Sequence, residues 1–296
     1  MDKKIIDGNK ISKKIYNEIK KEVTNLKGKY KKVPTLSVIL VGDYAPSKIY
    51  VTIKRRRSEE CGMNFHLYKF DDSISEKKLI NLIKKLNRDK KISGIIVQLP
   101  LPKKFNTERI LSFISPDKDV DGLHPINVGK LVLNEDTFLP CTPAGIMELI
   151  HSTKYKIEGK NAVIIGRSNI VGKPIAHLLL KENATVTITH SKTKNLEKIV
   201  KNSDIVIAAV GKPEFIKGSW IKKDSIVIDV GINRIPDKKS EKGYKIVGDV
   251  DFKNAYKKAK FITPVPGGVG PMTVAMLLKN TLKAFKGIYK IPMEEK

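Results

Sequence analysis

Cysteine is scarce in this 296-residue chain, and its placement excludes two kinds of cross-link. Cys61 and Cys141 lie far apart, with no C-x-x-C spacing and no neighbouring histidine cluster. A disulfide framework and a zinc site are therefore not expected, and we predict no bound metal. Such cysteine usage is typical of a reducing cytosol.

The sequence also lacks the apolar segments that export and membrane insertion require. Residues 1–8 carry charges where a signal peptide would have its apolar core. Residues 261–278 are uncharged, but their prolines and glycines argue against a membrane helix. We therefore expect a cytoplasmic protein with no membrane partner.

Acidic residues are few relative to basic ones, 31 against 57, which gives a formal net charge of +26. Three explanations stay open: nucleic-acid binding, a positive field that attracts polyanionic small molecules, and a genome that favours lysine codons. The lysines are scattered, and RNP-type aromatics and a helix-turn-helix are absent. We therefore expect no nucleic-acid partner.

The order of predicted elements indicates two α/β domains. Strands over 34–41, 64–70 and 94–99 alternate with helices over 46–61 and 76–86, after a first helix over 11–26. A second series follows the helix over 143–152, with short apolar strands at 161–165, 185–189, 204–210 and 225–229. Such alternation predicts parallel sheets with right-handed crossovers. The fold class is α/β, with an N-terminal three-layer α/β domain and a Rossmann-like parallel-sheet domain.

A turn between the strand over 161–165 and the following helix predicts a phosphate site. It reads Gly166-Arg-Ser-Asn-Ile-Val-Gly172, and free N–H groups at a helix N-terminus attract anions. The pattern departs from G-x-G-x-x-G, because Ser168 replaces the second glycine and the third comes one residue late. A plain turn stays the alternative.

The next strand lacks the carboxylate that usually binds the ribose of NAD. It ends Thr189-His-Ser-Lys192, so Arg167, Ser191 and Lys192 favour the 2′-phosphate of NADP. The alternative is that Arg167 and Lys192 are two exposed cations among many. Gly211 and the stretch Asp229–Asn233, which includes Ile232, also end strands and either line the cofactor or form turns.

Four polar residues of the first domain are candidate catalytic groups. Tyr50 and Lys54 share a helix face at i,i+4, although residues 54–57 could form only a basic surface run. Gln98 follows an apolar strand, at the sheet edge where open α/β proteins bind ligands. Asp121 precedes a glycine and is either a turn residue or an anchor for a guanidine-like heterocycle.

The segment Pro264-Val-Pro-Gly-Gly-Val-Gly-Pro-Met-Thr273 carries no charge and leads into an apolar helix. Proline fixes φ, and glycine lets backbone approach another surface closely. The segment is therefore either the wall of a slot for a flat ligand or a tight turn into the helix.

Taken together, these motifs closely resemble the bifunctional methylenetetrahydrofolate dehydrogenase/methenyltetrahydrofolate cyclohydrolase family over nearly the whole chain. The matching stretches are Ile6-Asp-Gly8, Tyr50-Val-Thr-Ile-Lys54, Gly94–Pro102, Asp119-Val-Asp-Gly122, Pro140-Cys-Thr-Pro143, Gly166–Gly172, Asp229–Asn233 and Pro264–Thr273.

The resemblance implies a folate-binding catalytic domain, 1–140 plus 273–296, an NADP-binding domain, 141–272, and the homodimer that is common in the family. It implies oxidation of 5,10-methylenetetrahydrofolate to 5,10-methenyltetrahydrofolate with NADP, followed by hydrolysis to 10-formyltetrahydrofolate. These reactions belong to one-carbon metabolism and feed purine and amino-acid biosynthesis. Polyglutamylated tetrahydrofolates would be the substrates, and their tails would give the positive field a use.

Residue roles carry over by position. The resemblance implies that Lys54 is the key group for hydrolysis, Gln98 its hydrogen-bonded neighbour, Tyr50 a stacking partner and Asp121 the pterin anchor. Other residues would complete the folate pocket, namely Ser47, Pro266, Gly267, Gly268 and Gly270. Those expected at the cofactor are Gly166, Arg167, Ser168, Ser191, Gly211 and Ile232. A lysine acts as a base only when its pKa is depressed, and we expect burial or the cations Arg55 and Arg56 to do so.

Arg56 stands where the family often has a second lysine, and we expect no fused formate-ligase domain. Some relatives keep the dehydrogenase and lose much of the hydrolase. A monofunctional NADP-dependent dehydrogenase is therefore the first alternative, and a basic nucleic-acid-binding protein is a remote one.

Overall fold

The computed structural model describes residues 3–240 and 243–292, and the chain folds into two compact units. The first, the nucleotide unit, groups Met1–Ser12 with Thr142–Thr273, and the second, the lysine unit, groups Lys13–Cys141 with Val274–Lys296. The units divide after Cys141 and after Thr273, and the expected domains divide after residues 140 and 272. Residues up to Ser12, expected within 1–140, group instead with the nucleotide unit, because the Ile6 N–H donates to the Ile262 carbonyl at 2.9 Å.

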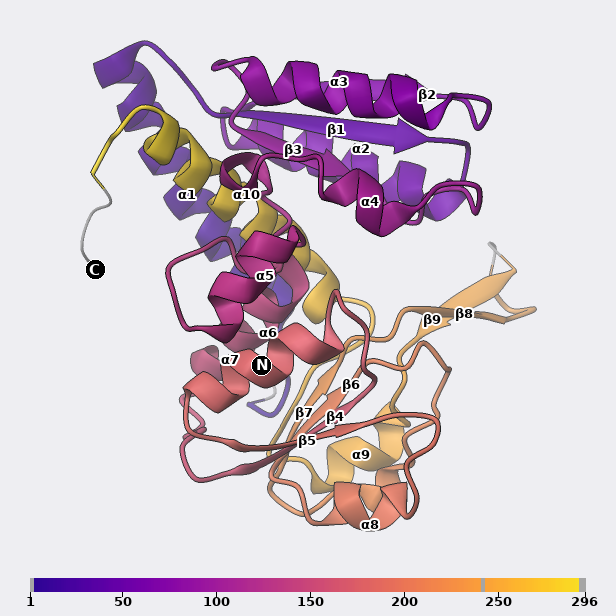
Figure 1. Cartoon of the computed structure of the whole chain (residues 1–296). Helices are drawn as coiled ribbons and strands as arrows, with labels where there is room; N and C mark the ends of the chain where they lie inside the picture. Colours follow the sequence, from indigo (N-terminus) through magenta and orange to yellow (C-terminus); the bar gives the residue numbers. More distant parts are fainter. Residues whose placement is uncertain (1–2, 241–242, 293–296) are drawn as a thin grey trace. The chain divides into compact units, whose positions relative to one another are not determined.

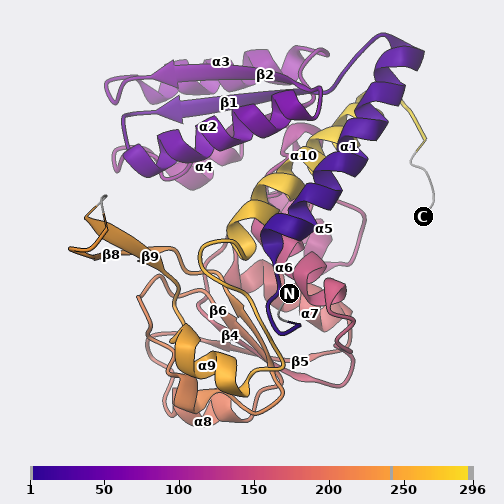
Figure 2. The ribbon, with the colours of Figure 1, turned by 180° about the vertical axis from the view of Figure 1, so that it is seen from behind.

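The lysine unit is built on a three-stranded parallel sheet in the order β2-β1-β3. Its strands are β1 (Thr35–Val41), β2 (Asn64–Phe70) and β3 (Gly94–Val97). Helices α3 (Glu76–Arg88) and α4 (Thr107–Leu111) cover one face, and α2 (Ala45–Glu60) covers the other (Figures 1 and 2). Because both faces are covered, every residue of β1 is buried, as its continuous apolar run predicts.

Short helices follow the sheet of the lysine unit. They are the 3₁₀ turn Pro116–Lys118 and α5 (Pro125–Val132). The long helices α1 (Gly8–Tyr30) and α10 (Val269–Ile288) each contain one of the boundaries between the units. The segment between Lys118 and α5 carries Asp121, so this part of the fold positions a candidate site residue.

The nucleotide unit contains a five-stranded parallel sheet in the order β10-β7-β6-β4-β5. The strands are β4 (Asn161–Ile165), β5 (Thr185–Thr189), β6 (Ile205–Ala208), β7 (Ile226–Asp229) and β10 (Phe261–Ile262). The helices are α6 (Cys141–Ser152), α7 (Gly172–Lys181), α8 (Leu196–Lys201) and α9 (Phe252–Lys258), with a 3₁₀ turn at Gly218–Trp220. The predicted two-domain α/β fold with parallel sheets is confirmed.

Two features of the nucleotide unit differ from expectation. An antiparallel hairpin of β8 (Asn233–Pro236) and β9 (Tyr244–Val247) was not predicted, because each of its strands has only four residues and gives a weak sequence pattern. Strand β5 was expected to be fully buried, but most of its side chains are exposed because it lies at the sheet edge.

In the described residues, no helix combines the length and apolar character that a membrane span requires.

Gly8 explains why two distant motifs both contain glycine. A Cβ atom placed on Gly8 would lie 1.8 Å from the carbonyl oxygen of Gly268. Gly268 is equally confined, since its own Cβ would lie 2.7 Å from the Pro264 carbonyl oxygen. The start of α1 and the Pro264–Thr273 segment therefore touch through backbone alone.

We predict that Gly8→Ala destabilises the protein, because a methyl group at this position forces two backbone segments apart. The expected loss is on the order of 1–3 kcal/mol, which lowers Tm by several degrees. Gly28→Ala in the same helix is the matched control. A Cβ there meets nothing within 4 Å, so alanine should raise helix stability slightly. Thermal unfolding by circular dichroism measures both, and equal Tm values would contradict the packing argument.

Candidate functional site

The sheet-facing side of α2 is unusual because it buries polar residues. Ser47, Val51, Lys54 and Ser58 are buried there at helical spacing. The Lys54 ammonium belongs to a residue that is only 8% exposed, and it donates a hydrogen bond of 2.9 Å to the Oε1 atom of Gln98. Burial excludes the interpretation of Lys54 as part of a basic surface run.

Gln98 is fixed by its place directly after β3. Its backbone N–H donates to the Ile39 carbonyl at 2.8 Å, and its side-chain Nε2 donates to the Leu99 carbonyl at 2.8 Å. This second bond turns Oε1 toward Lys54. The Ser47 hydroxyl also donates to the Leu99 carbonyl, at 3.3 Å, so Ser47, Lys54 and Gln98 form one network.

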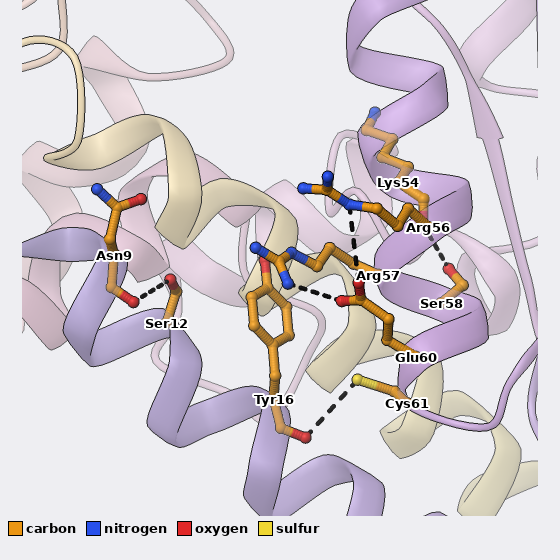
Figure 3. Close-up of polar contacts among 9 residues, drawn as sticks. All are labelled: Asn9, Ser12, Tyr16, Lys54, Arg56, Arg57, Ser58, Glu60 and Cys61. Carbon is orange, nitrogen blue, oxygen red and sulfur yellow. Dashed lines mark hydrogen bonds and ion pairs between the residues drawn. The ribbon is translucent and has the colours of Figure 1, made fainter.

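Burial lowers the pKa of Lys54, and the nearby charges of Asp121 and Cys141 oppose that shift in part. The expected contribution of Arg55 and Arg56 is wrong, because both side chains are exposed and directed elsewhere. Arg56 and Arg57 pair with Glu60 on the same helix, as Figure 3 shows, and Arg55 lies over the ring of Phe65. Of the two expected causes, burial therefore lowers the pKa of Lys54, and the cationic neighbours do not.

Asp121 lies near Lys54 and beside Cys141, which the sequence presents as a lone cysteine. Burial raises the pKa of the Cys141 thiol well above its usual value, and the carboxylate of Asp121 adds to the shift. The thiol donates to the Val120 carbonyl at 3.3 Å. In the sequence, the position of Cys141 within the Pro140–Pro143 motif was the one feature that could have identified it as a site residue. Lys54, Gln98, Asp121 and Cys141 therefore form one cluster in the lysine unit, in which Asp121 is half-buried and the other three residues are buried.

The Asp121 segment is held by α10 and by close backbone packing. The side-chain amide of Asn280 donates to the carbonyls of Val120 and Leu139, at 2.9 and 3.0 Å. Gly122 has a φ of 71°, and a Cβ on it would lie 2.6 Å from the backbone of Leu139. The Asp-Gly pair is therefore a turn, and that turn also places Asp121 beside Lys54.

Tyr50 lies between Ser47 and Lys54 on α2 and is half-buried. Burial raises the pKa of its hydroxyl, so the ring is uncharged at neutral pH. The ring is thus an apolar surface next to the polar network.

In the nucleotide unit, two glycines shape the turn after β4. Gly166 has a φ of 126°, and a Cβ on it would lie 2.2 Å from the Ala209 carbonyl oxygen. A Cβ on Gly172 would lie 2.3 Å from the carbonyl oxygen of Gly166. Gly172 therefore lets the helix approach the turn closely, as the third glycine of the G-x-G-x-x-G motif does, although it comes one residue later in this chain.

Ser168 changes the chemistry of this turn. Its hydroxyl accepts hydrogen bonds from the N–H groups of Val171 and Gly172, at 3.2 and 3.3 Å, and its carbonyl accepts from the Lys173 N–H at 3.1 Å. Residue 174 is proline and has no N–H group. The expectation of free N–H groups at the start of α7 is therefore wrong for these positions, because Ser168 already binds them.

The donors that remain for a nucleotide are exposed side chains and turns at the carboxyl ends of the strands. Arg167, Ser168, Ser191 and Lys192 are exposed, and no acidic residue stands between Thr189 and Lys192. Gly211 and Ile232 are also exposed, after β6 and β7 respectively. This donor set fits a phosphorylated ribose better than a free one.

The Pro264–Thr273 segment lies in the nucleotide unit and turns directly into α10. Pro266 is exposed, Gly267 has a φ of 106°, Gly268 is buried and Gly270 is half-buried. The segment is thus a tight turn. The role of this segment as one wall of a ligand-binding slot stays a prediction.

Comparisons with known proteins match both parts of the chain. The model of the tetrahydrofolate dehydrogenase/cyclohydrolase catalytic domain matches residues 6–121, and that of the family's NAD(P)-binding domain matches residues 140–289. The chain is similar to the bifunctional protein FolD of Listeria innocua, with 53% identity over 287 residues, 97% of this chain and 99% of the relative.

Solved structures give the same result. The bifunctional enzyme FolD of Campylobacter jejuni superposes with a TM-score of 0.92 at 48% identity, covering 96% of this chain and 98% of that one. The Trypanosoma brucei methylenetetrahydrofolate dehydrogenase-cyclohydrolase, solved with NADP and an inhibitor, also has a TM-score of 0.92, at 42% identity over 96% and 97%. The family expected from the motifs is confirmed, and with it the enzyme class and a nicotinamide dinucleotide cofactor. The chain belongs to the tetrahydrofolate dehydrogenase/cyclohydrolase family.

Proposed function

We propose that this protein oxidises 5,10-methylenetetrahydrofolate to the methenyl form with NADP and then hydrolyses that cation to 10-formyltetrahydrofolate. The observation that carries the proposal is the buried Lys54 amine, bonded to Gln98 and adjacent to Asp121. A dehydrogenase alone needs positioned rings but no base, whereas hydrolysis needs a group that accepts a proton from water. The lowered pKa of Lys54 therefore favours the bifunctional enzyme over a monofunctional dehydrogenase.

In this proposal Lys54 is the base of the hydrolytic step. Its neutral amine keeps a lone pair while one N–H bonds to Gln98, and Gln98 holds the amine in place. Lys54 takes a proton from water as the water oxygen bonds to the one-carbon bridge. The new hydroxyl group then loses its proton as the formyl carbonyl forms, and the bond between the bridge carbon and N5 breaks while N5 takes up a proton, so that one proton is released overall. Asp121 accepts hydrogen bonds from the pterin edge, and Tyr50 stacks on the substrate rings. Ser47, Pro266, Gly267, Gly268 and Gly270 complete the folate pocket.

NADP, when bound, supplies the hydride acceptor for the first reaction. The side chains of Arg167 and Ser191, with Lys192, would hold its 2′-phosphate, since the exposed strand ends carry no competing carboxylate. Gly166, Ser168, Gly211 and Ile232 would line the remainder. The bonds that Ser168 makes to the start of α7 give it a second purpose, because they fix the turn that carries Arg167.

We further propose a cytoplasmic homodimer that acts on polyglutamylated folates. The formal charge of +26 supports this substrate form, because a positive field raises the encounter rate with a polyanionic tail.

We predict that Lys54→Gln lowers methenyl hydrolysis by about 10²–10⁴-fold, because the base is lost, and leaves dehydrogenase activity measurable. NADPH formation and decay of the methenyl absorbance report the two reactions in one cuvette. The wild-type hydrolysis rate should rise with pH through a Lys54 pKa below the usual lysine value, since only the neutral amine takes a proton. Lys48→Gln on the same helix is the control. Normal hydrolysis in Lys54→Gln would refute the role of Lys54.

Asp121→Ala is predicted to raise KM for folate about tenfold or more in both reactions, because the pterin loses charge-assisted hydrogen bonds. The far-ultraviolet circular dichroism should not change. Asp117→Ala in the preceding turn, where the side chain is exposed and no site role is proposed, is the control for loss of a nearby carboxylate. Unchanged folate KM values in Asp121→Ala would remove the pterin anchor from the proposal.

For the cofactor, we predict that Arg167→Ala lowers the preference for NADP over NAD about tenfold or more, because only NADP carries the 2′-phosphate. The ratio of kcat/KM values for the two cofactors measures the preference. Lys181→Ala, at the far end of α7, removes another cation as a control. An unchanged ratio would eliminate Arg167 as a determinant of cofactor choice.

A further inference from the structure

Two buried carboxylates lie close to the strand ends that carry the proposed cofactor residues. Asp229 is the last residue of β7 and Asp249 follows β9, and they are 3% and 0% exposed. A buried carboxylate is costly unless it accepts several hydrogen bonds. The partners of these two residues therefore show what they hold in place.

Asp249 binds three consecutive backbone N–H groups of the loop after β6. Its Oδ2 atom accepts from Val210 at 2.6 Å and from Gly211 at 2.9 Å. Its Oδ1 atom accepts from the Lys212 N–H at 3.0 Å and from the side-chain amide of Asn233 at 2.8 Å. One side chain thus ties the loop after β6 to the start of β8.

Asp229 in turn fixes the backbone of Asp249. Its Oδ1 atom accepts from the N–H groups of Gly231 and Asp249, at 3.0 and 2.9 Å, and its Oδ2 atom accepts from Val250 at 2.9 Å. Glycine is required where these carboxylates approach backbone. A Cβ on Gly231 would lie 2.2 Å from an Asp249 oxygen, and one on Gly248 would lie 1.9 Å from an Asp229 oxygen.

The loop after β6 depends on this support. Gly211 is exposed and has a φ of 67°, and a Cβ on it would meet no atom within 4 Å, so packing does not hold it. Its conformation is set by the three hydrogen bonds to Asp249. Without an acceptor, adjacent N–H groups at the surface turn to water, and the loop samples other conformations.

We propose that Asp249 is a positioning residue for the cofactor: it presents Gly211 and, through Asn233, the adjacent Ile232 in the geometry that binds NADP. The inference rests on the proposed function, because it takes Gly211 and Ile232 as cofactor contacts. Asp249 itself is fully buried and acts only through the groups that it binds.

The chemistry of the site requires a carboxylate at this position. Both oxygens of Asp249 accept two hydrogen bonds each, and an asparagine has only one acceptor oxygen. If that oxygen faced Val210 and Gly211, its NH₂ group would face the donors of Lys212 and Asn233. The reverse orientation fails in the same way, so Asp249→Asn loses half of the bonds in either rotamer.

The test compares Asp249→Asn with Asp251→Asn, which makes the same change in charge two residues later. Asp251 caps α9 through the Asn254 N–H and lies outside both loops. NADPH binding followed by its fluorescence, the KM for NADP and the kcat/KM for methenyl hydrolysis without NADP are measured for each. Backbone amide hydrogen exchange at Val210, Gly211 and Lys212 reports the loop directly.

For Asp249→Asn we expect NADPH affinity to fall about tenfold or more and the KM for NADP to rise equally, with hydrolysis within about twofold of wild type and faster exchange at the three amides. Asp251→Asn should match wild type in all of these. Wild-type NADPH affinity in a folded Asp249→Asn overturns the proposal, as does an equal loss of hydrolysis. Failure of the wild-type chain itself to bind NADPH would instead refute the proposed function.

Gly211→Ala keeps the inference testable if Asp249→Asn does not fold. Alanine fits sterically but disfavours a φ of 67°, so it shifts the same loop and leaves both carboxylates in place. We expect it to weaken NADPH binding severalfold. Wild-type NADPH binding in Gly211→Ala would show that the geometry of this loop is irrelevant to the cofactor.

Discussion

The removal of the Lys54 ammonium from water is the constraint on which the lysine unit depends. A buried cation needs hydrogen-bond acceptors and a nearby negative charge, and these come from Gln98 and Asp121. Gln98 meets Lys54 because β3 ends at Val97, and Asp121 meets it because Asn280 holds the Val120 carbonyl. The pKa of Lys54 therefore depends on three elements: the end of β3, the sheet-facing side of α2, and α10 near the end of the chain.

Residues that follow the last paired residue of a strand make up part of the candidate site in both units. Gln98 follows β3, Gly166 follows β4, and the loop with Gly211 follows β6. At such positions the backbone leaves the sheet, so polar groups become accessible while the strand behind them stays buried. This is why the apolar strands, which are easy to recognise, also located the candidate site residues in the sequence.

Sequence patterns predicted what depends on local repetition and missed what depends on distant partners. The strands at 64–70, 161–165 and 185–189 were predicted to the residue, because short stretches rich in aromatic and β-branched residues lie there between turns. The positions of Lys54 and Gln98 followed from a helix face and a strand end. The roles of Cys141, Asn280 and Asp249 were missed, since their hydrogen bonds join residues that are 21, 160 and 39 positions apart. Ser168 was predicted as a cofactor residue that replaces the second glycine, but the hydrogen bonds of its hydroxyl to the start of α7 were missed.

The scarcity of acidic residues makes the buried ones informative. Asp119, Asp229 and Asp249 are all buried, and all bind N–H groups in place of the abundant lysines. A carboxylate oxygen accepts two bonds from fixed amides without ordering a long flexible side chain, whereas a lysine partner loses rotamer freedom when it pairs. Loops near the candidate sites are therefore held by buried aspartates, and most lysines stay exposed. Most of the positive charge of the chain thus lies on the surface, while buried carboxylates hold the loops in shape.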